Sequence, residues 1–240
     1  MGGIRIGALV NGAAILLGGL CGALFGRFLN DRSQETLGKV CGVSTLFIGI
    51  AGAMQGMLSI QDGALSSGQG MLVTLSLVLG ALIGELMNIE GLFERFGEWL
   101  KRRTGNASDL KFVDGFVTAS LTVSIGAMAV VGSIQDGLLG DPSVLMTKAV
   151  LDFIIIMVMT CSMGKGCVFS AIPVLALEGA MTLLAGLLEP VMTPAALASL
   201  SMVGSILIFC VGLNLVWGKQ LRVGNMLPAL VLAVIGAYLI

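Results

Sequence analysis

The stretch DPSVLMTKAVLDFIIIMVMTCSM, residues 141–163, decides the class of fold that this sequence predicts. After Asp141 and Pro142, residues 143–163 contain only two charged side chains, Lys148 and Asp152. A helix needs about 20 largely apolar residues to cross the hydrocarbon core of a bilayer. The stretch is long enough, so it predicts a membrane-spanning helix.

The composition of the whole chain agrees with this prediction. Of the 240 residues, 56% are hydrophobic and 11% are charged. Soluble domains carry about a quarter of their residues as charges, so the shortage indicates an integral membrane protein. No basic tail or stripe predicts binding to nucleic acid. We expect the partners to be the lipid bilayer and a small solute or ion, with assembly into a homo-oligomer left open.

Catalytic chemistry is not indicated by the residues present. The chain contains no histidine, which is the commonest general base and a frequent metal ligand. It also has no nucleophile motif of the GxSxG type. We therefore expect no enzymatic activity, no cofactor and no metal site, and we interpret the five cysteines as small packing residues.

Apolar stretches of spanning length recur along the chain. They predict an all-α, polytopic transmembrane bundle of seven or eight spans, at residues 6–26, 38–58, 70–88, 114–132, 142–163, 167–188, 196–217 and 226–240. The last stretch would rise only about 22 Å as a helix. The hydrocarbon core is about 30 Å thick, which leaves open whether 226–240 crosses the membrane fully.

Basic residues are distributed unevenly among the predicted loops. With eight spans and the N-terminus outside, 11 of the 13 Lys and Arg residues fall on one side, and the exceptions are Arg5 and Lys148. Lys and Arg collect on the cytoplasmic side of membrane proteins. We therefore expect a multi-pass protein of the plasma membrane with its N-terminus outside.

One polar segment divides the chain. Residues 92–103, LFERFGEWLKRR, predict an amphipathic helix at the cytoplasmic membrane surface. The linker 105–111 follows it. We treat 1–240 as one membrane domain with a first half, 1–104, and a second half, 112–240.

The pentapeptide SIQDG occurs twice, at 59–63 and 133–137, within fourteen-residue segments that are identical at nine positions. This pattern predicts an internal repeat of hairpins, with each copy at the outer end of a span. Transporters are often built from repeats whose binding site lies where the repeats meet. A duplication kept only because the hairpin packs well is the alternative, and Asp-Gly is also a common turn signal. We interpret Gln61, Asp62, Gln135 and Asp136 as polar groups that face one another near an external vestibule.

Charged residues inside predicted spans are expensive in hydrocarbon and mark candidate sites. Asp141 predicts an N-cap with Pro142 at the first helical position, which places Lys148 about 9 Å and Asp152 about 15 Å along the axis. The two lie four residues apart on one helical face, so we predict an ion pair between them. A purely structural salt bridge is the alternative. Glu178 lies near the middle of the next span, and Thr118 with Thr122 forms a hydroxyl stripe on the span 114–132.

Several segments together resemble a known family. They are GALVNGAAILLGGLCGALFG, LVLGALIGELMNIEGLFERFGEWLKRR, GFVTASLTVSIGAMAVVGSIQDGLLGDPSVLMTKAVLDF, FSAIPVLALEGAMTLLAG and VGNMLPALVLA. The chain is similar over nearly its whole length to the bacterial membrane proteins of domain-of-unknown-function family 554, the YqgA- or YdfK-like proteins. The resemblance implies a compact multi-span protein of the bacterial inner membrane and implies no particular activity. It also implies that position 178 more often carries Gln, which favours Gln135, Asp136, Lys148 and Asp152 as the central group.

From these features we expect a permease for a small solute or an ion, coupled to a proton or another cation. Its candidate binding residues are Gln61, Asp62, Thr118, Thr122, Gln135, Asp136, Lys148, Asp152 and Glu178. The alternative is a membrane scaffold or sensor that transports nothing and acts through the amphipathic helix 92–103.

Overall fold

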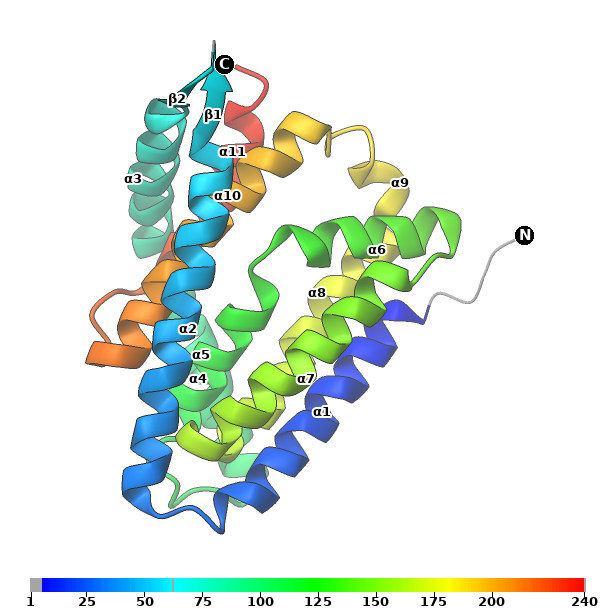
Figure 1. Cartoon of the computed structure of the whole chain (residues 1–240). Helices are drawn as coiled ribbons and strands as arrows, with labels where there is room; N and C mark the ends of the chain where they lie inside the picture. The colour runs from blue at the N-terminus through cyan, green and yellow to red at the C-terminus, as the bar shows by residue number, and fades with distance from the viewer. Residues whose placement is uncertain (1–5, 62, 240) are drawn as a thin grey trace. The chain divides into compact units, whose positions relative to one another are not determined.

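The computed structural model describes residues 6–61 and 63–239, and the described chain is almost entirely helical (Figure 1). Six helices are long and apolar enough to cross a membrane. They are α1 (Gly7–Gly26), α2 (Asp31–Met57), α3 (Gly70–Met87), α7 (Ser143–Met163), the 3₁₀ helix η1 (Lys165–Ser170) continuing into α8 (Ala171–Leu183), and α10 (Pro194–Trp217). The prediction of an all-α polytopic bundle is therefore confirmed.

A bent pair of helices takes the place of the predicted span 114–132. The stretch 114–132 does not form the continuous helix that we predicted. Instead α5 (Phe112–Ser124) and α6 (Ala127–Leu139) meet at a bend of 63° (Figure 1). Gly126 lies at the break with a φ of 152°, a conformation that side chains with a Cβ rarely adopt. This glycine ends the helix before the expected span is complete.

The remaining elements are short. The helix α4 (Ile89–Arg103) precedes the linker, α9 (Ala185–Leu188) follows α8, and η2 (Val223–Met226) leads into α11 (Pro228–Gly236). The apolar helix over η2 and α11 runs only from Val223 to Gly236 and stays below spanning length. This agrees with the short rise expected for the final stretch.

The two SIQDG copies have different structures. Residues 59–61 of the first copy lie in β1 (Leu58–Gln61), which pairs with β2 (Ala64–Ser67) so that Leu58 is opposite Ser67. The second lies within α6, where Ser133, Asp136 and Gly137 are buried. The second copy therefore does not form a turn, which was the alternative considered for the Asp-Gly pair. A pentapeptide has only a weak preference of its own, and its surroundings decide between helix and strand.

The chain divides into two compact units, each assembled from separated segments. One comprises Met1–Cys41, Gly91–Ser124 and Met128–Pro190, and the other comprises Gly42–Glu90, Ile125–Ala127 and Val191–Ile240. We call them unit 1 and unit 2. Each contains residues from both sides of the linker 105–111.

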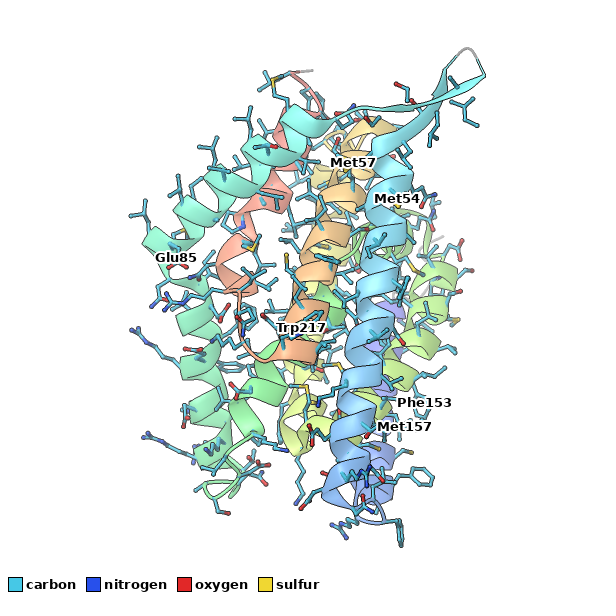
Figure 2. The ribbon with its side chains drawn as sticks, turned by 60° about the vertical axis from the view of Figure 1, so that its left-hand side comes forward. Met54, Met57, Glu85, Phe153, Met157 and Trp217 are labelled. Carbon is cyan, nitrogen blue, oxygen red and sulfur yellow. The ribbon has the colours of Figure 1, made fainter. Side chains whose placement is uncertain are left out.

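Unit 1 is held together by close contact between α1 and α7. A Cβ atom at Gly18 would overlap the carbonyl oxygen of Phe153, and one at Gly22 would overlap that of Met157. Figure 2 labels Phe153 and Met157 on α7. These contacts advance in the same direction along both helices, so α1 and α7 run parallel. In lipid, helices associate through close packing of small residues because no hydrophobic force drives them together.

The helix α8 runs antiparallel to α1. Gly12 of α1 faces Leu175 of α8, whereas Gly19, further along α1, faces Val168 of η1, which precedes α8. Three helices, α1, α7 and α8, therefore enclose one interior, and it is here that the polar side chains of unit 1 collect.

Unit 2 packs α3 and α10 around the short helix α11. Its core contains Leu72 and Val73 of α3, Met202 and Val203 of α10, and Ala229 and Ala233 of α11. Gly80 of α3 lies against the backbone of Ala229. At the other end of α3, Glu85 pairs with Arg222, with Nη1 and Oε2 3.2 Å apart; Figure 2 labels Glu85.

Candidate functional site

Asp141 sets the start of the helix that carries the central charges. Its carboxylate accepts a hydrogen bond from the backbone N–H of Ser143 at 3.0 Å, and the helix proper begins at Ser143. The Ser143 hydroxyl also donates to this carboxylate, and these bonds hold the pKa of Asp141 below its ordinary value of 3.8. The helix therefore starts one residue later than predicted: Pro142 is the N-cap, and Asp141 precedes it and accepts the Ser143 N–H from there.

Lys148 and Asp152 form the predicted ion pair on α7. Both side chains are buried, with 6% of Lys148 and 4% of Asp152 exposed. Lys148 makes two further contacts. Its Nζ atom lies 3.4 Å from Oε1 of Glu178 on α8 and donates to the carbonyl oxygen of Val123 at 2.8 Å. An ammonium group has three donors, and all three have an acceptor here.

The contact with Val123 links the charges to the broken helix. Val123 lies in the last turn of α5, where backbone carbonyls have no partner within the helix. In hydrocarbon such a carbonyl needs a donor from elsewhere in the protein. Lys148 supplies it, so one ammonium group joins two carboxylates and a helix end.

Asn11 of α1 completes the arrangement. Its Nδ2 atom donates to Oδ2 of Asp152 at 3.0 Å and to Oε1 of Glu178 at 2.8 Å. Asn11 and Glu178 are both 0% exposed. We call Asn11, Lys148, Asp152 and Glu178 the charged cluster.

The charged cluster has unused acceptors and no unused donors. Oδ1 of Asn11 and Oε2 of Glu178 are buried without a hydrogen-bond partner among the described residues. With every group ionised, two carboxylates face one ammonium, and the cluster carries one surplus negative charge. A buried charge of this kind is costly unless it is compensated. The arrangement therefore suits a proton or a small cation and disfavours an anion.

Other predicted residues lie apart from the charged cluster. Asp136 is buried on α6, where its Oδ2 accepts the backbone N–H of Gly7 at 3.0 Å. Gln135 is half-buried on the same helix. On α5, the hydroxyl of Thr122 donates to the carbonyl of Thr118 at 2.7 Å and is used within its own helix.

The first SIQDG copy contributes little that the structure describes. Gln61 ends β1, and Asp62 lies outside the described residues. That Gln61 and Asp62 face Gln135 and Asp136 stays a prediction.

The amphipathic helix is present, but its apolar face is partly covered. The ring of Phe96 lies 5.8 Å from that of Phe116 on α5, and Leu100 is buried. Trp99 stacks on Phe96 and remains half exposed, at 53%. A helix floating only among headgroups would leave Leu100 open, so α4 is also docked on the protein.

Sequence reasoning missed two members of the site. Asn11 is not among the predicted site residues, although an Asn inside an otherwise apolar helix is itself a signal of a buried partner. The Val123 carbonyl had no signal in its own residue type. The one sequence signal for the end of α5 is the nearby Gly126, because glycine can adopt the backbone conformation found at the break.

A helical chain with several spans and charges buried between them is a polytopic membrane protein. The chain belongs to the family described as Protein of unknown function (DUF554), whose model matches residues 6–238. It is 31% identical over 232 residues to the uncharacterized protein YqgA of Escherichia coli strain K12, covering 95% of this chain and 94% of that protein. It is 26% identical over 226 residues to the uncharacterized membrane protein YdfK of Bacillus subtilis strain 168, covering 94% and 93%. No solved structure matches the chain.

Proposed function

We propose that this protein transports a small solute or an ion across the bacterial inner membrane, coupled to a proton or another small cation that binds at the charged cluster. The observation that carries the proposal is the position of Lys148, which pairs with Asp152 and Glu178 and also holds the carbonyl of Val123 at the break after α5.

Physical cost supports this function over a purely structural role. Ionisable residues inside a membrane are expensive and usually mark substrate or ion pathways. A hydrophobic core of the same volume is often at least as stable as a buried ion pair. Interrupted helices at membrane depth are likewise typical of transporter binding sites, where freed backbone groups take part in binding. In this protein the buried charges and the helix break are joined by the ammonium group of Lys148.

The orientation of the protein is part of the proposal. The uneven distribution of Lys and Arg favours an N-terminus outside the cell. With that orientation α1 and α7 run inward and α8 runs outward. The first turns of α1 and α7 would then lie near the outer surface.

Flux measurements with purified protein in liposomes test the proposal. We expect uptake of at least one member of a panel of alkali cations, amino acids and organic acids, driven by an imposed pH or sodium gradient. D152N should reduce that flux at least about tenfold, because it removes the charge that positions Lys148. T147A is the matched control, since Thr147 lies on the exposed side of the same helix and its hydroxyl bonds only to the Ser143 carbonyl.

E178Q shows which carboxylate carries the coupling. We expect the flux to persist but to lose its dependence on the gradient, because Gln keeps the shape of the side chain and removes the surplus charge. Absence of flux with every compound, together with a D152N variant as stable as wild type, would sink the proposal. Loss of function on neutralising Arg95, Lys101, Arg102 and Arg103, with D152N unaffected, would favour the scaffold or sensor.

A further inference from the structure

Asp136 is the third buried carboxylate of unit 1, after Asp152 and Glu178, and it has no cationic partner among the described residues. It is 0% exposed, and within 6–61 and 63–239 its Oδ2 accepts a hydrogen bond only from the backbone N–H of Gly7. Among the described residues, no Lys or Arg forms an ion pair with Asp136. A single neutral donor compensates a buried negative charge poorly. A bound cation or a proton would therefore stabilise this carboxylate.

Further unpartnered oxygen atoms lie on the helices around it. Oδ1 of Asp136, Oγ of Ser133 and Oγ1 of Thr182 are buried without a hydrogen-bond partner in the described part of the chain. Ser133 is 0% and Thr182 is 5% exposed. Residues three apart on a helix share a face, which places Ser133 beside Asp136. A Cβ at Gly137 would overlap the carbonyl oxygen of Thr182, so this face of α6 lies directly on α8.

This polar group lies one helical turn from the charged cluster. On α1, Gly7 contacts Asp136 and Asn11 contacts Glu178. Four residues correspond to about 6 Å along the axis. On α8, Thr182 follows Glu178 by the same spacing. Because α8 runs antiparallel to α1, Thr182 lies on the Gly7 side of Glu178, and both steps lead in one direction.

The charged groups on the surrounding helices do not neutralise Asp136. On α7 they are Lys148 and Asp152, which are paired with each other, and on α8 there is Glu178, which adds negative charge. The residues of α1 include no charged side chain. Arg5 precedes Gly7 by two positions in the sequence and lies outside the described residues.

We propose that Asp136, Ser133 and Thr182 form a second binding station for a small monovalent cation, a proton or Na⁺, one helical turn from the charged cluster. This inference rests on the proposed function and gives it a path: the cation moves along α1 and α8 between the carboxylate of Asp136 and the surplus charge at Glu178. The oxygen-only composition of the station suits both ions, since Na⁺ is bound by hydroxyl and carboxylate oxygen atoms and a proton needs one carboxylate.

The test is the thermal unfolding midpoint of the purified protein. NaCl replaces choline chloride at constant ionic strength and pH in one titration, and pH varies at constant Na⁺ in the other. Binding to the folded state raises the midpoint as the site fills. D136N removes the charge and keeps an acceptor for the Gly7 N–H. We expect it to lose about half of the wild-type response, and E178Q to lose the remainder. A response to Na⁺ at fixed pH identifies the alkali ion, and a response to pH alone identifies the proton.

Two further variants make the outcome decisive. S133A/T182V leaves the charge in place and should shift the half-saturating Na⁺ concentration, or the midpoint pH, without abolishing the response. It also serves if D136N does not fold. R5Q should respond as wild type does, and a larger response in R5Q than in wild type would assign the compensation of Asp136 to Arg5. Identical titrations for wild type, D136N and S133A/T182V would overturn the inference.

Failure of the inference and failure of the proposed function give different results. If D152N abolishes flux while D136N leaves both flux and the cation response unchanged, the transporter stands without a second station. If wild type shows no flux with any compound but its cation response is lost in D136N, the station stands without transport.

Discussion

At the residue scale, Lys148 has more partners than any other charged side chain in the candidate site. It contacts Asp152, Glu178 and the carbonyl of Val123. Its removal leaves two buried carboxylates without a cation. The loss of stability on removing Lys148 should therefore exceed the contribution of any single one of its contacts.

We predict that K148M destabilises the protein by about 3–5 kcal/mol, because breaking a buried pair leaves an uncompensated charge. K148M/D152N should be less destabilised than K148M alone, since it removes one of the two stranded charges. The free energy of unfolding of both variants can be measured in detergent. K165M, at an exposed lysine, is the control and should behave as wild type. Equal stability of K148M and wild type would contradict the compensation that we describe.

Asp141 gives a prediction about pH. Hydrogen bonds from Ser143 lower the pKa of Asp141 in the folded protein, so the ionised form stabilises the fold above the ordinary pKa of 3.8. That stabilisation is lost as the pH falls through the lowered pKa. D141A should therefore unfold at a lower temperature than wild type near neutral pH, and the difference should shrink below about pH 4. D141N retains an acceptor and should fall between the two. A constant difference at every pH would contradict this stabilisation by the ionised Asp141.

At the scale of elements, the break between α5 and α6 shapes the candidate site. It frees the carbonyl that Lys148 holds and turns α6 so that Asp136 lies against Gly7. A continuous helix over 112–139 would keep Val123 within its own hydrogen-bond ladder.

We predict that G126A is destabilised by about 1–3 kcal/mol, because alanine rarely adopts a φ of 152°. No atom lies within 4 Å of the added methyl group, so the cost is conformational. Gly186 also has open space and has no left-handed φ, which makes G186A a matched control with little expected change. Thermal unfolding compares the two, and equal midpoints would mean that the break does not depend on this glycine.

At the scale of the whole molecule, the distribution of charge predicts which loops face the cytoplasm. The linker 105–111 follows a run of basic residues, whereas the hairpin of β1 and β2 carries none. These two segments should lie on opposite sides of the membrane.

Cysteine labelling tests this orientation. In a background without the five native cysteines, S66C in the hairpin should react with a membrane-impermeant maleimide in intact cells. A107C in the linker should react only after the cells are permeabilised. The reverse pattern would place the N-terminus inside, and equal labelling of both would contradict the number of spans between them.

The sequence by itself determined the features that depend on local spacing. Six of the predicted spans correspond to long apolar helices, because about 20 apolar residues suffice to specify a span. The pairing of Lys148 with Asp152 was also predictable, since helical geometry places residues four apart on one face whatever surrounds them.

Only the tertiary structure decided the features that depend on distant segments. Lys148 contacts Glu178 as well as Asp152, and Asn11 donates to both carboxylates. The carbonyl of Val123 accepts a hydrogen bond from Lys148. These contacts form because α1, α5, α7 and α8 bring distant segments together. Residues 59–61 of the first SIQDG copy lie in the strand β1, whereas the second copy lies in the helix α6. Short segments have weak preferences, and the free energy of burying or pairing them comes from residues that lie far away in the sequence.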